Sequence, residues 1–209
     1  MKLESESKIV KKPFQGFRKL YHVLGSSLFP LAYLYLPFEL SSATCRLMLL
    51  YATGAFFLAS CLLDIFRLSN REFNSRFMKL FSLLIRDSEE KRLNGSTFLC
   101  LAFFLVIFFF PAKIAITAMF FLSLGDAAAE LWGKNFGKAK IFGKSLEGTA
   151  AFFLVAFGIA FALWHSWPVA LMGALAGALV ELFSFEWDDN LTVPIGSAVA
   201  LWLIALLKF

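Results

Sequence analysis

The sequence predicts an all-α integral membrane protein: a bundle of about seven transmembrane helices with one interfacial amphipathic helix. The chain of 209 residues is 59% hydrophobic and holds 27 Phe, more apolar side chain than one water-soluble core of this size buries. The surplus is expected to face the lipid bilayer. The formal net charge of +5 would suggest nucleic acid in a soluble domain, but the basic residues lie in loops between apolar runs. No nucleic-acid partner is therefore expected.

The apolar runs divide the chain into a short tail and one domain. Residues 1–16 are predicted to form a basic cytoplasmic tail, and residues 17–209 a single transmembrane domain. Helical spacing from Phe17 onward indicates a charged helix start that leads into the membrane. The membrane helices are expected at 23–38, 47–65, 98–110, 114–125, 150–164, 169–183 and 191–207.

A polar stretch before the third apolar run repeats large apolar residues at helical spacing. Phe73, Phe77, Leu80 and Leu84 recur three or four residues apart, with basic residues between them. Such a basic amphipathic helix, at about 70–85, is expected to lie in the headgroup region. Packing of the same helix on its own bundle is an equally open alternative.

The runs 98–110 and 114–125 are both short, and Pro111-Ala112-Lys113 separates them. They form either one kinked helix or a hairpin of two. The hairpin places 17 of the 20 Lys and Arg on the cytoplasmic side, as the positive-inside rule requires. The N-terminus and the polar loops then face the cytoplasm, in a bacterial inner membrane or its equivalent.

Two carboxylates follow the fourth apolar run. Asp126 and Glu130 are four residues apart, so one persisting helical turn would place them on the same face. Mg²⁺ usually takes one or two protein carboxylates, which makes this pair a candidate metal site. A solvated helix end with two ordinary acids is the alternative.

Glycines and lysines alternate beyond these acids. Gly133, Gly137, Gly143 and Gly148 bracket Lys134, Lys138, Lys140 and Lys144, a pattern that suits a polyphosphate because glycine lets backbone N–H groups turn onto an anion. A P-loop is rejected because five residues, not four, separate Gly137 from Gly143-Lys144-Ser145, and no βαβ context surrounds the string. Ser145 is expected to cap the next helix.

Further polar groups are expected on the same membrane face. Glu181 lies at the edge of an apolar run, where a carboxylate needs a partner. Asp188, Asp189 and Asn190 follow, as part of the site or as a plain polar turn. Arg18, Lys19 and His22 precede the first helix, so three segments distant in sequence converge.

Several strings within these clusters resemble a known family. They are Gly125-Asp126-Ala127-Ala128-Ala129, Gly133-Lys134-Asn135-Phe136-Gly137, Gly143-Lys144-Ser145-Leu146-Glu147-Gly148-Thr149 and Asp189-Asn190-Leu191-Thr192-Val193-Pro194, with Arg18-Lys19 and His22 upstream. In order and spacing they resemble the CTP-dependent lipid-alcohol kinases (dolichol kinase, phytol kinase, CTP-dependent diacylglycerol kinase), which are related to phosphatidate cytidylyltransferase. The resemblance implies transfer of the γ-phosphoryl group of CTP to the hydroxyl of a membrane lipid alcohol.

Residues and resemblance together suggest roles for the polar groups. The catalytic candidates are Asp126, Lys144, Glu181 and Asp189, and the candidate Mg²⁺ ligands are Asp126, Glu130, Glu181 and Asp189. Nucleotide or phosphate contacts are expected from Arg18, Lys19, Lys134, Lys138, Lys140, Gly143, Lys144, Ser145 and Gly148, with His22, Glu147, Asn190 and Thr192 as further site residues. The proton acceptor is open among Asp126, Glu181, Asp189 and His22.

Three alternatives to the lipid kinase stay open. A phosphatidate cytidylyltransferase would use the same CTP and Mg²⁺ but release pyrophosphate, whereas a transporter or a structural membrane protein would carry out no chemistry. Against a transporter, the polar groups gather at one face and no inverted repeat is visible. A homodimer is a further open question.

Overall fold

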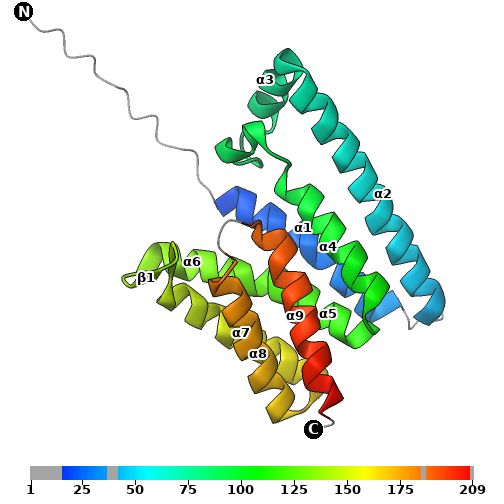
Figure 1. Ribbon diagram of the computed structural model, residues 1–209, viewed down its shortest axis with the longest axis vertical. Coiled ribbons are helices and arrows are strands. Elements are labelled where there is room, and N and C mark those ends of the chain that lie inside the picture. The colour runs from blue at the N-terminus through cyan, green and yellow to red at the C-terminus, as the bar shows by residue number, and fades with distance from the viewer. Residues whose placement is uncertain (1–15, 37–41, 185–186, 208–209) are drawn as a thin grey trace, which may run out of the picture.

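The computed structural model describes residues 16–36, 42–184 and 187–207, with only the backbone of Gly16 and Phe17 (Figure 1). The predicted tail before residue 16, the end of the first predicted helix at 37–38 and the link after it lie outside the described residues. Helices account for nearly all of the described ranges, and within them a single short hairpin is the only sheet. The all-α class is confirmed.

A helix lies at each of the seven predicted positions, though most begin earlier or end later than expected. In chain order the helices are α1 (Gly16–Tyr35), α2 (Ser42–Ser69), α3 (Arg71–Leu80), α4 (Gly95–Phe109), α5 (Ala112–Phe120), α6 (Ala127–Phe136), α7 (Leu146–Trp164), α8 (Trp167–Leu182) and α9 (Asp189–Leu206). The short helical segments η2 (Asp87–Lys91) and η3 (Phe121–Asp126) precede α4 and α6.

The long apolar helices define a helical membrane protein. Within the described residues, four helical runs are long and apolar enough to cross a bilayer: α2, the continuous run 112–136, α7 and α9. The helices α4 and α8 are apolar but shorter. The count of seven spans and the side of the membrane that each loop faces stay predictions.

The predicted helix end at residue 125 is wrong. The chain is helical without a break from Ala112 to Phe136, through the π-helical segment η3. Alanines favour the helix after Asp126, and the ion pair between Glu130 and Lys134 spans one turn of it. Asp126 and Glu130 are therefore held by a rigid helix, one turn apart, and not by a loop. A π-segment of this kind often accompanies a functional site.

The chain turns between α4 and α5 and does not continue as one kinked helix. Phe110 and Pro111 are both extended, with ψ of 153° and 149°. The residue before a proline is disfavoured in the helical conformation, which explains the break at this point. The α5–α6 run then leads back across the bundle, as the hairpin alternative predicts (Figure 1).

The segment between α6 and α7 is a small β-hairpin. Its strands are β1 (Lys140–Ile141) and β2 (Lys144–Ser145), which pair antiparallel with Lys140 opposite Ser145. The two loop residues, Phe142 and Gly143, have φ of 52° and 83°, which matches the tight turn that suits the strand twist. The hairpin places Lys144 on its second strand, directly before the start of α7 at Leu146.

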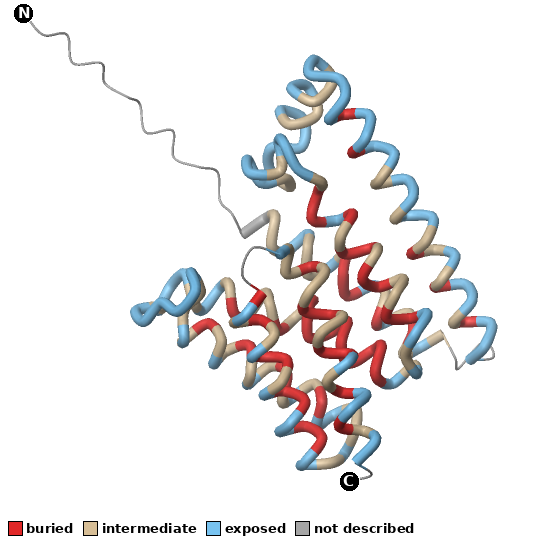
Figure 2. Tube along the Cα trace, viewed as in Figure 1, coloured by how far each residue is buried: buried red, intermediate tan, exposed pale blue. Residues whose placement is uncertain are grey.

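The core lies where α5 and η3 cross the bundle, and Figure 2 shows the buried residues concentrated there. Ala115, Ala118, Met119, Phe121 and Leu122 are fully buried, with α1, α7 and α9 packed around them. By contrast, α2 is exposed along most of its length (Figure 2). A helix that is apolar yet exposed on most sides fits a position against lipid.

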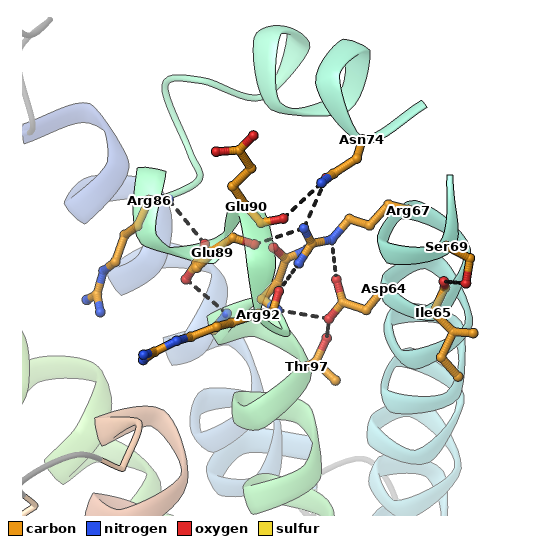
Figure 3. Close-up of polar contacts among 12 residues, drawn as sticks. Asp64, Ile65, Arg67, Ser69, Asn74, Arg86, Glu89, Glu90, Arg92 and Thr97 are labelled. Atoms are coloured by element: carbon orange, nitrogen blue, oxygen red, sulfur yellow. Dashed lines mark hydrogen bonds and ion pairs between the residues drawn. The ribbon is translucent and has the colours of Figure 1, made fainter. Parts of the chain in front are cut away.

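A buried ion pair ties the end of α2 to the start of α4 (Figure 3). Arg67 donates to Asp64 at 2.6 Å and to the carbonyl oxygen of Glu89 at 2.9 Å. Asp64 also accepts hydrogen bonds from the backbone N–H of Asn94 at 2.8 Å and the hydroxyl of Thr97 at 2.7 Å. Sequence analysis gave no role to either charge. The network satisfies N–H groups at the start of α4 that would otherwise lack partners.

The predicted amphipathic helix at 70–85 corresponds to α3, which ends at Leu80. Its aromatic side chains form a series with the end of α2: the ring centroids of Phe66 and Phe73 are 4.8 Å apart, and those of Phe73 and Phe77 6.1 Å. The Arg67 guanidinium lies 5.9 Å from the Phe77 ring centroid. The aromatic face of α3 thus packs against the end of α2, and the location of α3 at a membrane interface stays a prediction.

Candidate functional site

Lys144 is the centre of a charged cluster. Its ammonium Nζ lies 2.8 Å from a carboxylate oxygen of Asp189 and 3.0 Å from one of Glu181. The three residues come from β2, from the first residue of α9 and from the end of α8. The structure therefore brings together three of the four predicted catalytic residues, which are far apart in the sequence.

Two hydroxyl groups complete this cluster. Thr149 donates to the second oxygen of Glu181 at 2.9 Å, and Ser184 donates to Asp189. Glu181 is 4% exposed, so it depends on these partners for its charge to be tolerated. Sequence reasoning assigned no role to Thr149 or Ser184. Thr149 is the last residue of the motif that begins at Gly143, so the sequence could have indicated it. Ser184 lies between Glu181 and Asp188, and no other sequence feature indicated that it belongs to the site.

Electrostatics keep Lys144 positively charged. Burial acts to lower the pKa of its ammonium, but the carboxylates of Asp189 and Glu181 outweigh burial, and the net pKa is raised. The ammonium group is therefore a fixed positive charge at neutral pH. A fixed charge of this kind can neutralise a phosphate group without moving.

A second cluster forms around Glu130 on α6. Its carboxylate pairs with Lys19 at 3.3 Å, with Arg18 at 3.7 Å and with Lys134. The first turns of α1 thus pack their basic residues against α6, as convergence of these segments on one face predicts. Three cations around a single carboxylate leave formal positive charge for a further anion.

Asp126 interacts with both clusters. It lies on the same helical run as Glu130 and also interacts electrostatically with Asp189, Lys144 and Glu181. The helix that continues past residue 125 makes this possible, because it holds Asp126 and Glu130 one turn apart. Asp126 is therefore placed where the basic cluster and the Lys144 cluster meet.

The remaining lysines of the central segment lie elsewhere. Lys138, before the hairpin, and Lys140, on its first strand, are both exposed. Glu147 accepts a hydrogen bond from the backbone N–H of Ala139 at 3.4 Å. Of the four central lysines, Lys144 is the one that reaches Glu181 and Asp189 among the described residues. Phosphate contacts by Lys138 and Lys140 stay predictions.

The central glycines have a packing role. A Cβ at Gly148 would lie 2.7 Å from the carbonyl oxygen of Ala129, and one at Gly133 would lie 2.5 Å from the hydroxyl of Ser145. Only glycine allows α6 and the start of α7 to approach this closely. Ser145 accepts a hydrogen bond from the Gly148 N–H at 3.1 Å, which confirms it as the cap of α7.

The polar turn before α9 is both a cap and a part of the site. Asp188 caps α9 by accepting from the N–H of Asn190 at 2.9 Å, and Thr192 donates back to the carbonyl oxygen of Asp188 at 3.3 Å. Asn190 is buried, and its amide lies so close to Gly95 that a Cβ there would be 2.7 Å from it. Asp189 is thereby aimed at Lys144 by a rigid helix start.

A cavity of about 700 Å³ lies beside Asp126, between α1, α2, α3 and α4. One part of its lining is polar and includes His22, Asp126, Glu130 and Asn190. Another part is apolar and comes mainly from α1 and α2. Its size is within the range of small-molecule sites, and its lining changes from charged to apolar.

Within residues 16–36, 42–184 and 187–207, no group of three or more His, Cys, Asp or Glu surrounds a point that could hold a metal. Mg²⁺, however, needs only one or two protein carboxylates when substrate phosphates supply the other oxygens. The predicted Mg²⁺ ligands Asp126, Glu181 and Asp189 are close enough to interact, whereas Glu130 is engaged by basic side chains. The metal stays a prediction.

Fold and site together define a class: a helical membrane protein in which a lysine held by two carboxylates lies next to a cavity with a polar and an apolar part. The acidic and basic side chains of the two charged clusters come from α1, α6, β2, α8 and α9. Such an arrangement suits a reaction between a charged, phosphate-bearing molecule and an amphipathic one.

Similarity to known proteins defines this class of membrane protein more closely. It is 28% identical over 193 residues to an uncharacterized protein of Rickettsia prowazekii, a match that covers 87% of this chain and 90% of that protein. It is 29% identical over 168 residues to CTP-dependent diacylglycerol kinase 1 of Eremothecium gossypii, covering 66% of this chain and 53% of the kinase. It is 28% identical over 207 residues to the chloroplastic phytol kinase 1 of Arabidopsis thaliana, covering 89% of this chain and 65% of that kinase.

These similarities confirm the resemblance to the CTP-dependent lipid kinases. The chain spans about half to two thirds of the length of the two named kinases. No family model matches the sequence, and no solved structure matches it.

Proposed function

We propose that this protein transfers the γ-phosphoryl group of CTP to the hydroxyl of a membrane lipid alcohol, such as a polyprenol, a phytol-like isoprenoid alcohol or diacylglycerol. The observation that carries the proposal is Lys144 between Glu181 and Asp189, with Asp126 interacting with the same groups while it lines the cavity. The similarity to proteins named CTP-dependent diacylglycerol kinase and phytol kinase supports the donor and the class of acceptor.

Phosphoryl transfer asks a protein mainly for positioning and charge neutralisation. Lys144 supplies a fixed positive charge, oriented by two carboxylates, for the phosphates of the nucleotide. The alcohol oxygen forms a bond to the γ-phosphorus, the bond from that phosphorus to the β–γ bridging oxygen breaks, and CDP leaves. The hydroxyl proton passes to a carboxylate. Asp126 is our choice for this acceptor because it lines the cavity.

The residues present fit a divalent cation by their charge. Glu181 and Asp189 share a single lysine and Asp126 interacts electrostatically with all three, so the formal charges of the three carboxylates leave an excess of negative charge that a cation would offset. Asp189 would hold Mg²⁺ together with nucleotide oxygens, and the metal would supply further neutralisation of the phosphates. The basic group of Arg18, Lys19 and Lys134 is proposed to contact the remaining phosphates.

The proposed site lies on the cytoplasmic side of the membrane, where CTP is available. The support is the distribution of basic residues along the chain, 17 of 20 of which fall on one side of the predicted topology. A reagent that labels cysteines from one side tests this in intact cells. A cysteine at Lys138 should be protected from an external reagent and one at His165 labelled by it; labelling of both from outside would exclude the topology.

The function is tested with the full chain in lipid nanodiscs, given CTP or ATP labelled at the γ- or the α-phosphate and either a panel of lipid alcohols or phosphatidate. The expected product carries the γ label as a lipid phosphate, with CDP released. Transfer of the α label to phosphatidate with release of pyrophosphate would show a cytidylyltransferase instead. No lipid-dependent turnover of CTP or ATP would favour a transporter or a structural protein. Lys144→Met serves as the inactive control.

A further inference from the structure

The cavity beside Asp126 has an apolar part that the chemistry of phosphoryl transfer does not explain. Along α1, the residues His22, Gly25, Phe29 and Ala32 line it at intervals of three and four, so they form one face of the helix. This face begins polar and becomes apolar. The ten helical steps from His22 to Ala32 span about 15 Å at about 1.5 Å per step.

The other walls of this part come from α2 and α4. Phe56 and Leu63 contribute from α2, and Leu99 from α4. Phe29 connects the walls, because its ring contacts those of Phe56, at 6.2 Å between centroids, and Phe103, at 5.7 Å. Three helices thus enclose an apolar channel that leads to the polar part.

Exposed apolar residues of α1 and α2 border the channel. Leu28 is 65% exposed and Phe56 59% exposed, although both line the cavity. Apolar side chains that are this exposed on membrane helices face lipid. Lipid is therefore expected beside the channel, whose length along α1 of about 15 Å is about half of a hydrocarbon core of about 30 Å.

We propose that the channel between α1, α2 and α4 holds the hydrocarbon chain of the lipid alcohol, with its hydroxyl at Asp126. The proposal rests on the proposed kinase function, since it assigns the acceptor to one place next to the charged clusters. Asp126 belongs to the polar lining of the cavity and also interacts with Lys144. A chain in the channel therefore brings the hydroxyl to Asp126, beside the Lys144 cluster.

Gly25 on α1 allows a direct test of whether the channel holds the hydrocarbon chain. A Cβ at this position would meet nothing within 4 Å, and Gly25 lines the cavity, so a larger side chain is expected to extend into the channel. Replacement of a glycine inside a helix also favours the helical state. Gly158 on α7 is the matched control, because a Cβ there also meets nothing within 4 Å and the residue does not line the cavity.

The experiment measures kcat/KM for a long-chain alcohol and for a short, water-soluble alcohol with the same head group, in Gly25→Ala, Gly25→Leu, Gly25→Trp and Gly158→Trp. For the long-chain substrate, Gly25→Trp should lose about tenfold or more, the effect of keeping two methylene groups from their site. The loss should grow from Ala to Trp. The short alcohol should be used equally well by all four variants, and Gly158→Trp should match the wild type.

A photoactivatable analogue of the alcohol, with its diazirine on the chain, gives a readout that needs no catalysis. Crosslinks should fall in α1 and α2, and Gly25→Trp should abolish them. Equal kinetics in Gly25→Trp and Gly158→Trp, or crosslinks confined to other helices, would overturn the channel while wild-type kinase activity still supported the proposed function. Absence of kinase activity in the wild type would instead refute the function, and crosslinking alone would then decide the channel.

Discussion

Replacement of Arg67 by Met should be among the most damaging single changes in this protein. The side chains of Arg67 and Asp64 are both 0% exposed, and their atoms meet at 2.6 Å. The substitution keeps a long apolar stem but leaves the buried Asp64 carboxylate without its cation and the carbonyl oxygen of Glu89 without its donor. Breaking a buried pair by removing one partner costs about 3–5 kcal/mol.

Arg76→Met is the matched control. Arg76 also pairs with an acid on its own helix, Glu72, at 2.5 Å, but their side chains are 78% and 76% exposed. Exposed pairs of this kind contribute at most about 1 kcal/mol. The two variants therefore lose the same residue type and the same kind of contact, and they differ in burial.

The assay is thermal unfolding of the detergent-solubilised protein, followed by tryptophan fluorescence. At about 2–4 °C per kcal/mol for a chain of this size, Arg67→Met should lower the midpoint by roughly 6–20 °C, and Arg76→Met by a few degrees at most. The double variant Asp64→Leu, Arg67→Met should be more stable than the sum of the single changes implies, because no unpaired charge is left. Equal midpoints for Arg67→Met and Arg76→Met would refute the reasoning.

Four further outcomes are expected. Lys144→Met should lower kcat by about 10² to 10³-fold while the protein stays folded, because a fixed positive charge at the reacting phosphate is lost, and unchanged turnover would remove Lys144 from the site. Because the folded state raises the pKa of Lys144, its ion pairs stabilise fully below the unfolded value of about 10.4 and are lost as pH rises through the folded pKa. The difference in midpoint between the wild type and Lys144→Met should therefore be constant from about pH 7 to 9 and shrink above about pH 10.4. Gly148→Val should cost roughly 1–3 kcal/mol in an unfolding titration, since its Cβ would lie 2.7 Å from the Ala129 carbonyl oxygen, whereas Gly158→Val should be neutral. Chelation with EDTA should abolish activity and Mg²⁺ restore it, with Asp189→Asn needing more Mg²⁺ for half activity; an equal requirement in the two proteins would argue against Asp189 as a ligand.

The hydrophobic runs predicted helix positions well and helix ends poorly. The sequence between Asp126 and Gly137 looks like a loop because it mixes glycines with charges, yet it is helical to Phe136. Gly133 does not break the helix there, since Ser145 and Gly148 pack against it. A tertiary contact overrides local propensity in such a case.

Conversely, the buried pair of Asp64 and Arg67 could not be found from spacing. Both lie at the polar end of an apolar run, where charged residues are normally solvated. Their partners, near Glu89 and Asn94, are more than twenty residues away and include backbone groups, which carry no sequence signal. Only the packing of α2 on α4 makes the charges buried.

The sequence by itself determined the class of protein, the approximate helices, the residues of the charged clusters and the resemblance to lipid kinases, because composition, periodicity and short motifs are local properties of the chain. Tertiary structure decided which charges meet: Lys144 with Glu181 and Asp189, and Glu130 with Arg18 and Lys19. It also decided where a cavity lies and which part of it is apolar. These features arise from segments that are distant along the chain, and their distances depend on how the helices pack, which no local pattern encodes.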